Sequence, residues 1–102
     1  MSIINTTLTT SPAAIYTSTG TSATTVLHFC NYTNNGATAH VWLVPNGGTA
    51  TNGTIIYYAV TLTAGQTLVV DTEKIILSNG DAIYASASAG SSVTATVSYI
   101  GL

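Results

Sequence analysis

The sequence predicts an all-β protein: one antiparallel β-sandwich, jelly-roll-like, with about eight strands. Residues that favour a pleated, half-buried strand dominate the chain, among them 20 threonines. Four Asn-Gly pairs, which tolerate the positive φ of tight turns, divide the chain into short runs. Apolar and polar residues alternate with period two in several of these runs. The 102 residues, 46% of them hydrophobic, suffice for one domain with one core.

Eight strand-like runs follow one another along the chain. They cover residues 3–10, 13–18, 23–31, 37–44, 54–63, 66–71, 81–87 and 93–100. Residues 1–12 form either an arm that reaches a neighbouring molecule or the first strand of the same sheet, and residues 13–102 form the sandwich domain. The mixed segment 72–79 is a short helical turn or an extended crossing.

Alternation assigns the core faces of three runs. Their predicted core residues are Val93, Ala95, Val97 and Tyr99; Ala39, Val41 and Leu43; and Ile83, Ala85 and Ala87. The run 54–63 is apolar on both faces, so it is either a central strand or a strand pressed against a neighbouring subunit.

Only four residues carry a formal charge, and all lie between Asp71 and Asp81. The net charge of −2 and the single lysine argue against binding to nucleic acid or to anionic membranes. On the strand map the charges fall in one connection, which we expect to form a solvated end of the sandwich. The remaining surface, neutral and rich in threonine, suits permanent packing against protein. We expect Asp81 to bond backbone amides and fix the turn into its strand.

The N-terminal residues show neither the basic nor the apolar region of a secretory signal, and Cys30 alone forms no internal disulfide. These features indicate synthesis and folding in a reducing cytosol.

The residues that could carry chemistry are few. His28 and Cys30 share one strand face, where parallel neighbours seldom bond directly, and His40 could meet His28 across the hairpin at 32–36. Neither pair matches a catalytic or metal motif. Asp71, Glu73 and Asp81 could bind calcium if the loop gathered them, but a solvated acidic loop is the preferred interpretation. We therefore expect no enzyme, no metal and no cofactor.

Trp42 should face away from the core beside His40, with Tyr57 or Tyr58 nearby. Such an aromatic surface could hold a sugar ring, as in lectin-like sandwiches, or anchor a subunit interface. We favour the interface. The predicted oligomer or capsid interface comprises Ile3, Ile4, Leu8, Trp42, Tyr57 and Tyr58.

Several segments resemble those of small β-sandwich virion proteins of tailed bacteriophages, including cyanophages. They are residues 15–17 (IYT), 30–33 (CNYT), 43–48 (LVPNGG), 62–68 (LTAGQTL) and 77–83 (LSNGDAI). The resemblance implies a jelly-roll fold and a virion setting, with capsid cement or decoration proteins as the nearest type.

The sequence thus suggests a structural protein that cements or decorates a phage capsid by binding the assembled coat lattice as a homo-oligomer, expected to be a trimer. Its partners would be its own copies and the major capsid protein or another virion protein. The protein would be made in the host cytoplasm and end on the capsid exterior, or in the tail. The alternative is a tail or fibre module that binds a host-surface glycan through Trp42 and neighbouring tyrosines.

Overall fold

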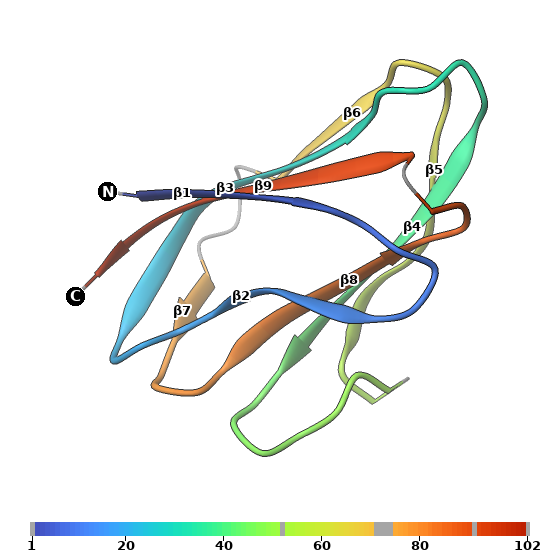
Figure 1. The fold of residues 1–102 in the computed structure, drawn as a ribbon. Helices are drawn as coiled ribbons and strands as arrows, with labels where there is room; N and C mark the ends of the chain where they lie inside the picture. The colour runs from blue at the N-terminus through green and yellow to red at the C-terminus, as the bar shows by residue number, and fades with distance from the viewer. Residues whose placement is uncertain (1, 52, 71–74, 91, 102) are drawn as a thin grey trace.

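The computed structural model describes residues 2–51, 53–70, 75–90 and 92–101. Every regular element in these ranges is a β-strand. The strands are β1 (Ser2–Thr7), β2 (Ala13–Thr17), β3 (Ser22–Asn31), β4 (Ala37–Val44), β5 (Ile55–Leu62), β6 (Thr67–Val70), β7 (Ile75–Leu77), β8 (Ala82–Ala87) and β9 (Val93–Gly101). They form two antiparallel sheets that face each other, with both chain termini on the same side of the molecule (Figure 1).

The first sheet has the order β1-β9-β3-β6, with β7 also paired to β3, and the second has the order β2-β8-β4-β5. In the middle of the sheets, β9 pairs with β3 and β8 pairs with β4. The remaining pairs are β1 with β9, β2 with β8, β3 with β6 and β7, and β4 with β5. A ribbon of paired strands that wraps into two sheets in this way is a jelly roll, so the fold expected from the sequence is confirmed.

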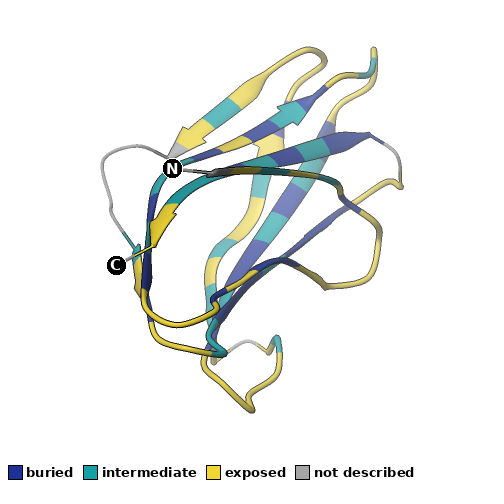
Figure 2. Cartoon of the chain, turned by 60° about the vertical axis from the view of Figure 1, so that its left-hand side comes forward, coloured by how far each residue is buried: buried dark blue, intermediate teal, exposed yellow. Residues whose placement is uncertain are grey.

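The core lies between the sheets, and buried and exposed residues alternate along the strands (Figure 2). The alternation assigned to residues 37–44, 81–87 and 93–100 is correct: Val41 of β4, Ile83 of β8 and Val93 of β9 are fully buried, as predicted. Leu43 and Tyr99 are only half-buried at the margin of this core. Period-two patterning was sufficient here because both sheets bury one face and leave the other outside.

The N-terminal run is the first strand of the first sheet and not a free arm. β1 pairs with β9 in continuous register from Ser2 opposite Tyr99 to Thr7 opposite Thr94. Leu8 follows this strand and is only 2% exposed. Its expected place in an interface is therefore wrong: Leu8 is a core residue of its own chain.

The segment 72–79, for which the sequence left two alternatives, contains a ninth strand, β7, in its described part. Asp71, Glu73 and Lys74 lie outside the described residues, and so does the calcium alternative that used Asp71 and Glu73. The prediction for Asp81 is confirmed. Its carboxylate accepts hydrogen bonds from the backbone N–H of Ser78 at 3.0 Å and of Asn46 at 2.9 Å.

The neighbouring turn depends on a glycine. Gly80 has φ +88°, and a Cβ there would lie 2.5 Å from the side chain of Asn46. A side chain at this position would therefore strain the backbone and displace the loop that Asp81 holds.

Candidate assembly surface

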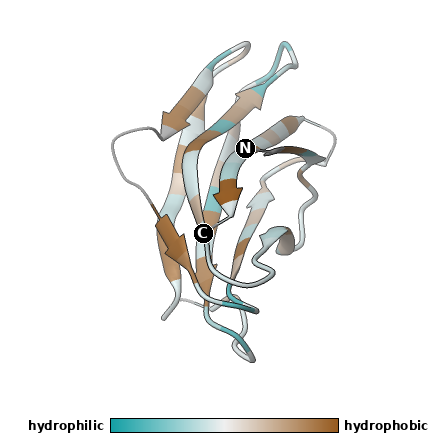
Figure 3. Cartoon of the chain, turned by 90° about the vertical axis from the view of Figure 1, so that its left-hand side faces the viewer, coloured by the Kyte–Doolittle hydropathy of each residue, from teal (hydrophilic) through white to brown (hydrophobic). Residues whose placement is uncertain are grey.

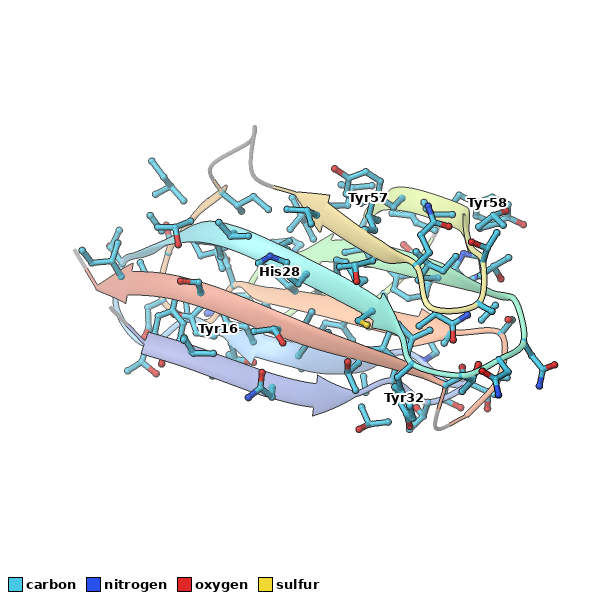
Figure 4. All side chains as sticks on the ribbon, turned by 90° about the horizontal axis from the view of Figure 1, so that it is seen from above. Tyr16, His28, Tyr32, Tyr57 and Tyr58 are labelled. Atoms are coloured by element: carbon cyan, nitrogen blue, oxygen red, sulfur yellow. The ribbon has the colours of Figure 1, made fainter. Side chains whose placement is uncertain are left out.

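The residues that the structure describes on the outer face of the first sheet carry no charge. The register places residues of neighbouring strands in rows across this face, for example Val69, His28, Thr96 and Asn5 from β6, β3, β9 and β1. Figure 4 looks down on the sheet, with β1 at one border and His28 on the central β3. Hydroxyl and amide groups fill the middle of the row, where the Thr96 hydroxyl donates to Asn5 Oδ1 at 2.8 Å.

Aliphatic side chains on this face remain exposed. One row runs from Ile76 on β7 through Ala23 to Ile100 on β9, and Ile76 is 68% exposed. At the β1 border Ile3 is 67% exposed. β7 and the end of β6 stand out as brown in Figure 3, where hydrophobic residues are brown. A face that combines exposed aliphatic groups with hydroxyls and no charge is suited to contact with another protein surface.

The outer face of the second sheet is different because its tryptophan is covered. Trp42 does face away from the core, as predicted, but it is only 7% exposed. The ring centre of His40 lies 5.8 Å from that of Trp42 and 5.0 Å from that of Tyr58. Trp42 is therefore no open platform, and the glycan alternative loses the exposed ring on which it depended.

His40 also fixes the backbone of the neighbouring edge strand. The backbone N–H of Ala59 donates to His40 Nδ1 at 2.9 Å, and Ala59 has φ 50°, which is unusual for a residue other than glycine. The register between β4 and β5 shifts at this point and again near Trp42. These irregularities make β5 a bulged strand.

β5 lies at the border of its sheet. Of the two alternatives for this run, the central strand is thus wrong. Tyr57 packs against the core and is half-buried, whereas Tyr58 on the opposite side is 73% exposed. Ile4, another predicted interface residue, also packs against the core.

Of the six predicted interface residues, Ile3 and Tyr58 have large exposed side chains, and they lie in different sheets. Ile76 and Ile100 were not predicted, and they extend the outer face of the first sheet. For Ile100 the sequence did contain a signal, because this apolar residue follows the alternating residues of β9. Ile76 had no such signal, because the three apolar residues of β7 do not alternate.

The histidines and the cysteine considered for chemistry do not form one site. His28 and Cys30 share the outer face of β3, whereas His40 lies on β4 in the other sheet, so the two histidines do not meet. No three His, Cys, Asp or Glu side chains gather to hold a metal ion within residues 2–51, 53–70, 75–90 and 92–101. No pocket opens on the surface formed by the described residues.

No protein-family model matches the chain, and no curated protein or solved structure matches it either. Within the described ranges, no helix is long and apolar enough to cross a membrane.

Proposed function

We propose that this protein is a structural, non-enzymatic virion component that decorates or cements a bacteriophage capsid as a homo-oligomer. The observation that carries the proposal is the outer face of the first sheet, where the described residues carry no charge and Ile3 and Ile76 remain exposed among threonines. The jelly-roll fold and the resemblance of the sequence to phage virion proteins support a place for this surface in a virion. The partners would be further copies of the chain and the coat lattice, on the capsid exterior.

The mechanism would be stabilisation by selective binding. A protein that binds only the assembled lattice stabilises it by RT ln(1 + [L]/Kd), about 4 kcal/mol per site at a thousandfold excess over Kd. An ordinary interface buries about 800 Å² on each partner. This is a modest fraction of the 5208 Å² that the described chain exposes, so one sheet face is large enough in scale.

The absence of charge among the described residues of this face has a physical consequence. A buried ion pair requires both charges to lose their water, and an unpartnered charge is costly to bury. Hydroxyl and aliphatic groups avoid this cost, and threonine supplies both in one side chain. The face therefore suits a permanent contact whose affinity depends little on the salt concentration.

The experiment is to locate the protein in purified virions and to remove it. We expect it in the capsid at a fixed ratio to the coat protein, and we expect particles without it to release their DNA at a lower temperature. Adding back the purified protein should restore the original temperature. Replacing Ile76 by lysine should abolish the restoration, whereas replacing exposed Thr61 of β5 by lysine should not. Absence of the protein from purified particles would overturn the proposal.

A further inference from the structure

The backbone of β1 has one row of hydrogen-bonding groups beside which none of the described strands lies. The N–H of Leu8 donates to the C=O of Val93 at 2.8 Å, which continues the register of Thr7 opposite Thr94. In an antiparallel ladder, only every second residue bonds to a given neighbour. Ile4, Thr6 and Leu8 therefore bond to β9. The N–H and C=O groups of the residues between them point to the open edge of the sheet.

The residues whose backbone points to this edge are Ile3, Asn5 and Thr7. The strand has six residues in continuous register, with no proline and no charge. Natural proteins usually protect such an edge with charges, prolines or bulges.

The other edges of the two sheets are interrupted. β5 is bulged at Ala59, and β2 shifts register between Ala14 and Tyr16. Opposite β1, the border of the first sheet is divided, because β6 and β7 pair with separate parts of β3. Among the described strands, β1 is the regular edge without protection.

We propose that β1 pairs antiparallel with β1 of a second copy, about a two-fold axis at Asn5, so that the two first sheets become one continuous sheet. This inference deepens the proposed function and rests on its claim of self-association. It assigns that association to one strand and one symmetry. A trimer, which the sequence alone suggested, would require β1 to join a different edge, and those edges are interrupted.

The register between the two copies of β1 is restricted by the two faces of the strand. Directly opposite residues in an antiparallel pair lie on the same face of the sheet. With the axis at Asn5, Ile3 lies opposite Thr7 of the second copy and Asn5 lies opposite itself. All three edge residues then bond in both copies, with about six hydrogen bonds in total. On the inner face, half-buried Ile4 comes opposite half-buried Thr6.

A second copy fits better than an unrelated strand for two reasons. Isologous pairing satisfies the same groups on both chains at once. The outer-face row next to the edge is uncharged, so two copies meet without like-charge repulsion. A two-fold axis perpendicular to the sheet also keeps both outer faces on the same side. The dimer therefore doubles the uncharged face and can bind a repeating lattice through two equivalent sites.

Cysteine crosslinking tests the register in solution, without any virion. In a background where Cys30 is replaced by serine, Asn5→Cys places two thiols opposite each other, on Cα atoms about 5.5 Å apart. A short bismaleimide should join them within minutes. The matched control, Ile3→Cys, places its two thiols about 14 Å apart along the strands and should not be joined. Mixing the Ile3→Cys and Thr7→Cys chains should restore crosslinking.

Sedimentation of charge variants tests the edge itself. The unaltered chain should form a dimer of twice 10.4 kDa. Asn5→Lys places like charges opposite each other at the axis and should raise the dimer dissociation constant by about tenfold or more. Thr61→Lys, on the edge strand of the other sheet, should leave it unchanged. Circular dichroism should show the same strand content for both variants.

A chain that is monomeric at all concentrations, or a trimer, would overturn the two-fold pairing. So would a dimer that is indifferent to Asn5→Lys and does not crosslink at position 5. None of these results would exclude the chain from a virion. Conversely, a dimer formed through β1 by a protein that is absent from particles would keep this inference and reject the proposed setting.

Discussion

Trp42 on the outer face of the second sheet differs from Ile3 and Ile76 on the outer face of the first in how far the chain covers it. On the second sheet Trp42 points outward, yet the chain covers it with its own residues, and His40 lies between its ring and that of Tyr58. On the first sheet Ile3 and Ile76 point outward and remain uncovered. An apolar residue that points out of a sandwich is thus evidence of an interface only if the neighbouring residues of its own chain leave it exposed.

The largest expected effect concerns the covered face. Trp42→Ala removes a large ring that is buried outside the core, and we expect it to lower the free energy of unfolding by about 3 kcal/mol, in the range for buried aromatic residues. Urea unfolding followed by circular dichroism measures this loss. Tyr58→Ala, at a mostly exposed ring, is the control and should lower the same free energy by less than about 1 kcal/mol. Equal losses would show that Trp42 is not specially covered.

The next effect isolates the hydrogen bond under the ring cluster. His40→Phe keeps a ring beside Trp42 but leaves the N–H of Ala59 without its acceptor. We expect the free energy of unfolding to fall by about 1 kcal/mol, the net contribution of one hydrogen bond whose donor stays accessible to water. Amide exchange at Ala59 should accelerate in the same variant. An unchanged rate there would mean that His40 does not hold the bulge.

A smaller effect of opposite sign concerns the strained residue of that bulge. Ala59→Gly relieves a left-handed conformation that is unfavourable by about 1 kcal/mol for alanine, and glycine loses part of this gain through its more flexible unfolded state. We expect a net stabilisation of about 0.5 kcal/mol by calorimetry. Ala14→Gly, in an edge strand without positive φ, should destabilise the protein instead. The same sign for both substitutions would contradict the assignment of strain to Ala59.

The smallest effect on stability belongs to the uncovered face. Ile76→Thr should change the free energy of unfolding of the single chain by less than about 0.5 kcal/mol, because the side chain has little contact to lose. Its neighbour provides the contrast: Leu77→Thr, at a buried position, should be destabilising by several times as much. If Ile76→Thr is also strongly destabilising, the first sheet covers its outer residues after all, and the contrast between the faces is wrong.

Much of the fold could be predicted from the sequence because alternation and Asn-Gly turns are local signals. The strand at 37–44 has the predicted ends, and the outward direction of Trp42 followed from its neighbours in the same strand. The burial of Trp42 could not be predicted, since it depends on which residues of other strands lie opposite it, namely Tyr84 of β8 and Ile55 of β5. The edge position of β5 is likewise a property of the pairing and not of its own residues.

The candidate surface was predicted less well than the fold. The scarcity of charge indicated a surface for assembly, and Ile3, one of the residues predicted to lie in it, is exposed. The choice of face, however, required the register, which places Ile76 of β7 in line with Ile100 of β9. Leu8 was misassigned because the predicted strand extended to residue 10. In the structure β1 ends at Thr7, and Leu8 is buried in the core.

Residue-resolved amide hydrogen exchange along β1, at low and high protein concentration, tests the account most directly. The amides of Ile4 and Thr6 bond to β9 and should be protected at both concentrations. The amides of Ile3, Asn5 and Thr7 should exchange freely in dilute solution and become protected as the concentration rises, while the edge amides of β5 stay unchanged. Free exchange of Ile3, Asn5 and Thr7 at every concentration would contradict the claim that this edge is where the protein assembles.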